Sequence, residues 1–497
     1  MRFEIIGTQY AALEIPDEDW AQTPKSVQVA FLEQGRILNE QAKVIMAMVK
    51  TIAVLQKRLE ILEEKLNTNS RNSGKPPSSD PPGTLPNRGK ANTEKKSRGG
   101  QPGHAGHSRQ LFPPSEVDKV FDRMPENCER CGFSLHDEAS TNYIPHQFVE
   151  LAVKLFDVFE YRRHSKKCPC CDEVTVGTLP EGISLRNFGP RLTETMSMMA
   201  GTYHMGRRSI VDFVYQILGI KISLGTVSSS EGLVGKALRP AMDELHELIQ
   251  RVEAANADDT GWRESNKYAC LWVVTSPKLT YYRITQDKTA ATAETILGSF
   301  NGVLISDRGS NLKFYNGTRQ TCWAHLDRHF VRMSERVGLS ATIGLEAMKI
   351  TDSVFAAWHK FTSDEIDHEE FLDQLDPLRK QLKVTLTRGT KCGHTKTENT
   401  CQNILDIYPT LWVFAYLDGV EPTNNAAELA LRLGVLWRRT SYGSYSLRGC
   451  EFVASMLSVV ATCKKQGRSV LNFIQDSLDA FLRNIPGPTL RPAQAPS

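Results

Sequence analysis

The 497-residue sequence contains no run of about eighteen uncharged apolar residues, so we expect no segment to span a membrane. Its first twenty residues also lack the basic start and apolar core of a signal peptide. Composition shows no extreme, because hydrophobic residues make up 40% and charged residues 24% of the chain. These absences argue against membrane-spanning and secreted classes and predict a cytoplasmic protein.

Disulfides are not expected among the eleven cysteines, because cytoplasmic thiols stay reduced. The chain is too long for one hydrophobic core, so two or more domains are expected. Net charge is only +3, yet residues 69–110 carry eight basic residues against two acidic ones, a local charge of +6. Pro, Ser, Asn and Gly dominate this segment, which predicts a flexible linker. Its charge suits a polyanionic partner, although a merely solvated linker fits equally well.

Residues 27–67 predict one long helix with a narrow apolar seam. A period averaging 3.5 residues is typical of a coiled coil, whose seam needs a partner helix. We favour self-association over packing on the same chain, and the number of strands stays open. Two interleaved registers form the seam: Ile45, Ile52, Leu59 and Leu66, and Met48, Leu55 and Leu62.

Two cysteine pairs, each with a two-residue gap, predict a structural zinc site. Such a gap lets one turn present two thiolates, and four thiolates complete the tetrahedral coordination of one Zn²⁺ ion. Residues 146–167 between the pairs are rich in Val, Phe and Tyr and predict strands. A redox pair or coincidence is the alternative, and Cys170 inside the second pair is an ambiguous member. The predicted ligands are Cys128, Cys131, Cys168 and Cys171.

Residues 181–250 predict an all-helical segment. Arg207–Gly219 is apolar at helical spacing and ends at a glycine, and a second helix is expected to begin near Gly225. Helix, short turn and helix are compatible with a DNA-reading helix-turn-helix. Plain packing of two helices fits the pattern at least as well.

From about residue 251 the pattern changes to strands. Three β-rich runs, a helical stretch and a short apolar strand ending at Asp307 follow one another, which is the order of a ribonuclease-H-like core. Asp258 and Asp307 are then expected near neighbouring central strands. A carboxylate beside a buried strand is costly without a cation, and Mg²⁺ prefers such oxygen ligands. Glu428 would supply a third carboxylate, from a helix capped by Asn424 or Asn425. Taken singly, each acid fits a turn or a helical ion pair equally well.

Several long strings resemble a known family, among them DDTGW, SDRGS, CWAHLDRHF and PTNNAAELALRLGVLWRRTSYGSYSLRG. Over about residues 40–480 the chain resembles the large transposase, transposase C, of the bacterial insertion-sequence family sixty-six. The resemblance implies an Asp-Asp-Glu transposase with a ribonuclease-H-like core, associated with the nucleoid when it is on DNA.

Carried over by motif, the catalytic triad falls on Asp258, Asp307 and Glu428, which would hold two Mg²⁺ or Mn²⁺ ions. The family usually has Glu after the first acid, where this chain has Asp259. Adjacent strand residues face opposite sides, so only one of the two reaches the metals, and the motif aligns Asp258. The expected reaction is hydrolysis that frees a 3′ hydroxyl at a transposon end, followed by attack of that hydroxyl on target DNA.

DNA, as transposon ends and as target, is the expected partner. Basic residues near the third acid and in the linker are expected to contact phosphates. A non-catalytic, zinc-containing DNA-binding protein derived from a transposase is the alternative function, and the complete triad argues against it. The predicted DNA contacts are Arg432, Arg438, Arg439, Arg448, Lys464, Lys465 and Arg468 together with Lys95, Lys96 and Arg98.

The predicted fold class is multidomain, with an α/β ribonuclease-H-like catalytic core that carries a helical insertion. A coiled coil, a zinc-binding module and an all-helical segment precede this core. The expected boundaries are 1–67 for the N-terminal segment with its coil, 68–110 for the basic disordered linker, 111–180 for the zinc module, 181–250 for the helical segment, 251–485 for the catalytic domain with its insertion at about 340–420, and 486–497 for a tail.

Overall fold

The chain divides into two compact units, each built from two stretches of sequence. One combines Met1–Asn87 with Ala324–Ile407, and the other combines Arg88–Trp323 with Tyr408–Ser497. Among the described residues, no helix is both long enough and apolar enough to cross a membrane. The structure is a computed structural model that describes residues 2–3, 13–14, 16–70, 72–73, 111–127, 129–137, 142, 144–149, 151, 155–180 and 186–493.

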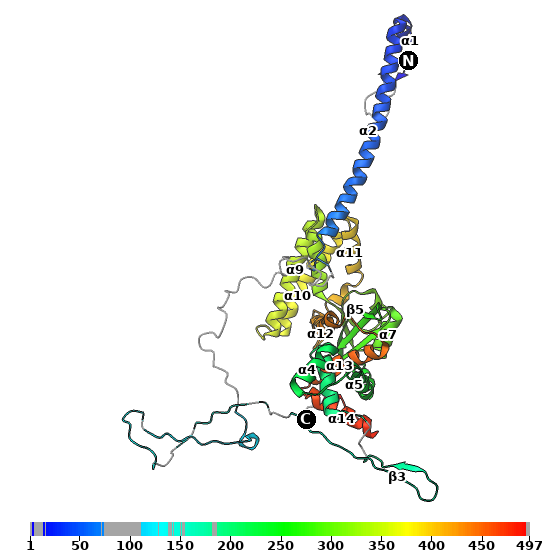
Figure 1. The fold of residues 1–497 in the computed structure, drawn as a ribbon. Helices are drawn as coiled ribbons and strands as arrows, with labels where there is room; N and C mark the ends of the chain where they lie inside the picture. The colour runs from blue at the N-terminus through cyan, green and yellow to red at the C-terminus, as the bar shows by residue number, and fades with distance from the viewer. Residues whose placement is uncertain are drawn as a thin grey trace. The chain divides into compact units, whose positions relative to one another are not determined.

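One long helix dominates the N-terminal part of the first unit (Figure 1). Helix α2 (Lys25–Leu66) follows the pair β1–β2 (Arg2–Phe3 and Leu13–Glu14) and helix α1 (Asp17–Gln22). The long helix predicted over residues 27–67 is therefore confirmed. All seven predicted seam residues are exposed, for example Ile45 at 60% and Leu59 at 59%. The apolar stripe thus lies in solvent in the single chain.

The turn after α2 is anchored to helix α8 (Trp323–Ser334). Asn72 is buried, and its side-chain amide donates to the Asn67 carbonyl at 2.9 Å and to the Glu335 carboxylate at 2.6 Å. Arg332 donates to the Thr68 hydroxyl at 3.1 Å. Polar contacts therefore fix the end of α2 within its unit.

Three further helices complete the first unit and occupy most of the predicted insertion. They are α9 (Leu339–Thr362), α10 (His368–Gly389) and α11 (Thr395–Leu405). Asp367 and Glu370 form a capping box at the start of α10, which satisfies two backbone donors there. Phe361 and Phe371 stack at 4.7 Å between α9 and α10, so aromatic packing joins the two helices.

Four helices of the second unit precede its sheet. They are α3 (Pro190–Gly201), α4 (Arg207–Leu218), α5 (Leu224–Ala237) and α6 (Arg239–Ile249). The sequence predicted α4 and α5 as two helices separated by a short turn. Gly219 ends α4 with a φ of 69°, a conformation that glycine adopts without steric cost. The Ser223 hydroxyl caps α5 by accepting from Thr226.

A mixed five-stranded sheet forms the centre of the second unit, in the order β7-β6-β5-β8-β9. Strands β5 (Ala254–Glu264), β6 (Lys267–Thr275) and β7 (Thr280–Thr285) are antiparallel neighbours. Helix α7 (Ala290–Leu297) leads to β8 (Val303–Ser306), which lies parallel to β5. This succession of elements was predicted. The three-residue strand β9 (Arg319–Thr321), parallel to β8 after the single turn η3 (Ser310–Leu312), was not.

Helices cover both faces of the sheet. On one face lies α12 (Asn425–Ser441), where the Tyr282 hydroxyl donates to the Ala430 carbonyl. Helix α13 (Leu447–Lys465) lies along the free edge of β7, where the Tyr282 N–H donates to the Ser458 hydroxyl. On the other face His246 of α6 stacks on Tyr281 at 4.8 Å. Single turns η4 (Tyr408–Leu411) and η5 (Val413–Ala415) precede α12, and α14 (Val470–Arg483) follows α13.

The region of the two cysteine pairs contains little regular structure among its described residues. Strands β3 (Ser165–Lys167) and β4 (Val174–Val176) form a hairpin around the second pair, and a single turn, η2 (Pro114–Glu116), lies further upstream. The prediction of strands through residues 146–167 was wrong for the described residues before Ser165. Apolar content alone does not make a strand where no sheet partner is adjacent.

Candidate active site

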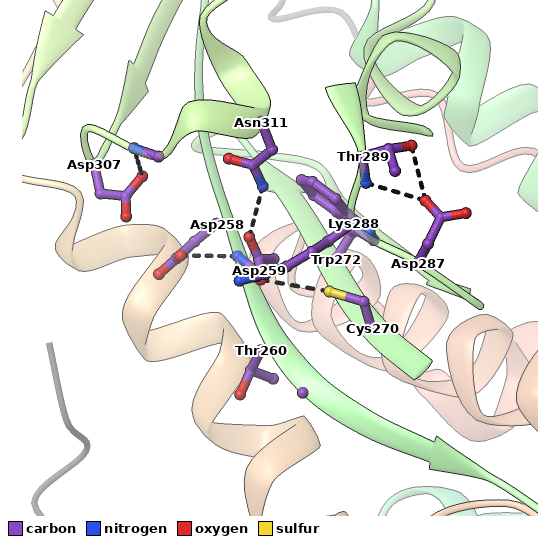
Figure 2. Close-up of polar contacts among 12 residues, drawn as sticks. Asp258, Asp259, Thr260, Cys270, Trp272, Asp287, Lys288, Thr289, Asp307 and Asn311 are labelled. Carbon is purple, nitrogen blue, oxygen red and sulfur yellow. Dashed lines mark hydrogen bonds and ion pairs between the residues drawn. The ribbon is translucent and has the colours of Figure 1, made fainter. Parts of the chain in front are cut away.

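The register between two parallel strands brings Asp258 and Asp307 to the same level. Ala254, Ala255 and Asn256 of β5 pair with Val303, Leu304 and Ile305 of β8. Continuing this register sets Asp258 opposite Asp307, the first residue after β8, and paired residues share one face of a sheet. Figure 2 shows both side chains on the side of β5 away from Asp259. Asp258 lies within β5, as predicted when Asp258 and Asp259 were treated as adjacent strand residues.

Asp258 is half-buried and electrostatically unfavourable as a bare carboxylate. Burial, and then the negative charge of Asp307, raise its pKa to about 8, and the charge of Glu428 adds to the shift. The N–H of Asp259 donates to its Oδ1 at 2.8 Å and opposes the shift only in part. Three carboxylates thus converge here and repel one another.

Asp307 belongs to a tight turn that leaves part of its carboxylate available. Its Oδ1 accepts the N–H of Gly309 at 2.7 Å, as in a turn aspartate. A Cβ at Gly309 would lie 2.8 Å from that oxygen, so a larger residue there would displace the Asp307 carboxylate. Arg319 donates to the Ser306 hydroxyl at 3.1 Å and to the Asp307 carbonyl at 3.4 Å, which fixes the backbone of the turn.

A buried asparagine fixes the helix of Glu428 to the strand of Asp258. Asn424 has no exposed surface, and its side chain donates to the Ala257 carbonyl at 2.9 Å while it accepts from Asn256 at 3.1 Å. Asn424 precedes α12, as predicted, but its side chain makes no cap hydrogen bond. It binds β5 instead, so Glu428 in the first turn of α12 lies beside Asp258.

Cys322 joins a second motif to the same place. Its sulfur accepts the N–H of Asn424 at 3.2 Å and lies within 4.8 Å of a Glu428 carboxylate oxygen. The N–H of Trp323 donates to Pro422 at 2.9 Å. The strings CWAHL and PTNNAAE are therefore adjacent in space. Our prediction included neither Asn424 as a strand anchor nor Cys322, and only the two motif strings drew attention to them.

Asp259 points to the opposite side of β5 and is held by three neighbours (Figure 2). The Asn311 amide donates to its Oδ2 at 2.9 Å, the Lys288 ammonium lies 3.6 Å from its Oδ1, and the Cys270 thiol donates to Oδ1 at 3.4 Å. Asp259 in turn raises the pKa of Lys288. These contacts give Asp259 a structural role and connect it to the turn after Asp307.

Residues 201–451 match the family described as Transposase IS66 family. The match spans the sheet, the three acids and the anchoring motifs. The chain belongs to this family. A second match, over residues 23–110, is to a family of unknown function (DUF6444).

Three curated relatives of this IS66-family chain come from Sinorhizobium fredii and are named only as uncharacterized proteins. The protein y4hP is 25% identical over 395 residues, covering 70% of this chain and 69% of the relative. The protein y4qI is 24% identical, with 55% of this chain and 56% of the relative covered. The protein y4jD is 23% identical, and 57% of its length is covered.

The predicted DNA-binding cations of this IS66-family chain differ in their surroundings. Lys465 donates to Ser276 at 2.6 Å, and burial lowers its pKa to about 8. Arg468 donates to Thr489 at 2.7 Å, and Arg438 donates to Gly261. These three side chains therefore serve contacts within the chain. Lys465 is nevertheless exposed, as are Arg432, Arg439, Arg448 and Lys464, whereas Lys95, Lys96 and Arg98 lie outside the described residues.

The cysteines predicted to bind zinc lie on turns, where they are described. Cys168 starts the β3–β4 turn, donates its N–H to Glu173 at 2.8 Å, and has its pKa lowered by hydrogen bonds from the N–H groups of Cys170 and Cys171. A lowered thiol pKa favours the thiolate that binds metal. Cys131 lies in a turn closed by the N–H of Leu135 on Glu126 at 2.9 Å. Cys128 lies outside the described residues.

Proposed function

We propose that this member of the Transposase IS66 family binds transposon-end DNA and catalyses metal-dependent strand cleavage and strand transfer. The observation that carries the proposal is the convergence of Asp258, Asp307 and Glu428 in a half-buried cluster. Burial, and then repulsion by the neighbouring carboxylates, raises the pKa of Asp258, so the cluster suits a bound cation better than an empty carboxylate site.

The sheet supports a ribonuclease-H-like core. Three antiparallel strands, a helix and two parallel strands follow one another, and the order β7-β6-β5-β8-β9 puts β5 in the centre. The turn after its parallel neighbour β8 supplies the second acid, and α12 adds the third from the face it covers. A rigid sheet and a packed helix then hold the carboxylates in place, which favours precise positioning of a phosphate.

The donor set fits Mg²⁺ or Mn²⁺. All three side chains offer hard oxygen atoms, and one oxygen of Asp307 is already used by Gly309. Two bound cations would stabilise the attacking and the leaving oxygen of an in-line phosphoryl displacement. The three carboxylates would hold these cations, while Asn424 and the Asp307 turn keep the acids from separating.

The chain's own basic residues provide the path for DNA. Arg432 follows Glu428 by one helical turn and Arg439 by about three, so both lie near its face of α12, and both are exposed. Phosphates on either side of the reacting one would contact them. Water would attack the phosphodiester first, which frees a 3′ hydroxyl, and that hydroxyl would then attack a target phosphate and release the target strand's own 3′ oxygen.

A cleavage assay on duplexes that carry the element's own ends tests the proposal. The wild-type chain is expected to cut those ends in Mg²⁺ or Mn²⁺ and not in EDTA. Binding to the ends without any cleavage, in either metal, would favour the non-catalytic DNA-binding protein instead.

Asp259→Asn is expected to keep cleavage within about tenfold of wild type, because this side chain lies on the other side of β5 from the cluster. The loss of its ion pair with Lys288 should lower the free energy of unfolding by about 1 kcal/mol. Cleavage rates and thermal melting measure the two effects, with Asp258→Asn as the matched variant. Loss of cleavage only in the Asp259 variant would transfer the ligand role to Asp259.

The cysteine turns lead us to propose one structural Zn²⁺ per chain. Zinc should copurify at about one ion per chain, and Cys131→Ser should lose it and destabilise the segment around residues 125–175, because metal binding contributes folding energy in small modules. Elemental analysis and limited proteolysis provide the measurements, with the buried core thiol variant Cys463→Ser as control. Protein purified without chelator that contains no zinc would contradict the module.

A further inference from the structure

The loop between α12 and α13, residues 442–446, presents two exposed tyrosines. Tyr442 and Tyr445 are each 83% exposed, among the highest values for aromatic residues in the described chain. Tyr442 also has a φ of 59°, in the left-handed region that residues with a Cβ rarely occupy. Such conformations persist where surrounding contacts enforce them, and they concentrate at functional sites.

Contacts with the tip of the β5–β6 hairpin enforce the conformation of this loop. Ser444 donates its N–H to Arg263 at 2.9 Å, and its carbonyl accepts from Ser265 at 2.9 Å. The Trp262 ring N–H donates to the Ser444 hydroxyl at 3.3 Å. Gly443 lies so close that a Cβ would be 2.4 Å from the Arg263 carbonyl oxygen. The backbone is therefore fixed while the two rings remain in solvent.

Several arginines lie on the elements that hold this loop. Burial, and then the charges of Arg439 and Arg263, lower the pKa of Arg438, so three guanidinium groups lie close together here. Arg263 and Arg439 are exposed. Arg448, exposed in the first turn of α13, donates to Ser228 at 3.2 Å. Glu264 at the hairpin tip and Glu451 of α13 are acids near this loop, and Glu451 pairs with Arg239 at 3.3 Å, so the four arginines outnumber them.

Strand β5, which carries Asp258, and helix α12, which carries Glu428, both lead to this loop. From Asp258 to Glu264 strand β5 covers about 20 Å at ~3.3 Å per residue. From Glu428 to Tyr442 helix α12 covers about 21 Å at ~1.5 Å per residue. One DNA strand advances ~3.4 Å per nucleotide, so a strand held at the carboxylates reaches the loop within about six nucleotides.

We propose that Tyr442 and Tyr445 form a stacking site for unpaired bases of DNA, with the neighbouring arginines on its phosphates. Exposed aromatic faces beside cations are how proteins bind single strands without regard to sequence, because every base has a π-face. Tyr and Arg are also enriched at protein interfaces, but the path along β5 and α12 from the carboxylates to this loop favours a DNA strand here. The inference rests on the proposed DNA substrate, and it adds that the end DNA is locally unpaired.

Fluorescence anisotropy with the full chain tests the site on two probes, a labelled oligothymidine strand and a mixed-sequence duplex of equal length. Tyr442→Ala with Tyr445→Ala should weaken single-strand binding about fivefold or more, because each lost stack removes a contact of that order. Duplex binding should change less. Tyr442→Phe with Tyr445→Phe should bind like wild type, as should Tyr203→Ala, a control tyrosine that is 66% exposed.

Several outcomes would overturn the stacking site. Alanine variants that bind the single strand as wild type does would show that the rings do not contact bases. Equal losses for Phe and Ala, or for both probes, would point to the hydroxyl or to general phosphate binding. A changed sedimentation coefficient in the double Ala variant would assign the surface to a protein contact. A wild-type chain that binds neither probe nor the element ends would instead contradict the proposed function.

Discussion

Asp307→Asn is expected to lower the rate of strand cleavage by at least about a hundredfold while the chain still folds and binds DNA. The amide keeps the size of the side chain and still accepts the Gly309 N–H, so the turn should persist. It no longer supplies the negative charge that holds a divalent cation. Cleavage of end-bearing duplexes in Mg²⁺ is the measurement, and Asp243→Asn, an exposed aspartate of α6, is the matched control.

The same variant makes a prediction about stability that does not depend on activity. Asp258 has a raised pKa in the folded chain, so its contribution to stability is complete below its ordinary pKa and is lost as pH rises toward about 8. Asp307→Asn removes one cause of that shift. Without metal, at neutral pH, the variant should therefore melt at the same temperature as wild type or higher, and only wild type should gain stability from added Mg²⁺.

Inactivity combined with a lower metal-free melting temperature would indicate that Asp307→Asn disturbs the fold, and the catalytic assignment would then lose its support. Cleavage near the wild-type rate would contradict the assignment directly. The two readouts separate a metal ligand from a residue that only stabilises the turn.

The sequence predicted most reliably those elements whose pattern is local. Helix α2 follows from apolar periodicity over many residues, and strands β5, β6, β7 and β8 follow from β-rich or apolar runs between turn residues. Strand β9 was not predicted because three residues are too few to show an apolar period. Its partner groups lie far away in sequence, since the Gln320 amide oxygen accepts from Phe414. A strand stabilised by such tertiary contacts has no local signature.

Side-chain partners across the sequence were the part that pattern could not supply. Asparagine is a common residue at helix N-caps, and only the proximity of β5 directs the Asn424 amide to the Ala257 carbonyl. Lys465 and Arg468 have the charge expected of DNA contacts, yet Lys465 binds the β6–β7 turn and Arg468 binds the C-terminal segment. Residue type predicted the chemistry available at these positions, and tertiary packing decided which neighbour uses it.

Ile52→Asp combined with Leu59→Asp is expected to produce monomers that retain the catalytic fold but make no paired-end products. These two seam residues are 54% and 59% exposed in the single chain, and a stripe of that length is stable only against another helix. We therefore propose that α2 pairs two copies of this chain. Pairing would bring two basic linkers, each about +6, to one DNA complex. The affinity for DNA should then fall steeply with salt, by about 0.9 log units per phosphate contacted for each tenfold rise in salt concentration.

Sedimentation and paired-end cleavage measure the two effects on the same samples. Ala47→Asp with Ala53→Asp adds equal charge to the outer face of α2, away from the seam, and should leave both assembly and products unchanged. The Asn72 and Arg332 contacts that fix the end of α2 to its own unit are untouched in either variant, so loss of pairing should not unfold that unit. A wild-type chain that stays monomeric both free and on DNA would contradict pairing through α2. Full paired-end activity of the seam variant would also contradict it, because two aspartates in the seam should prevent the helices from pairing.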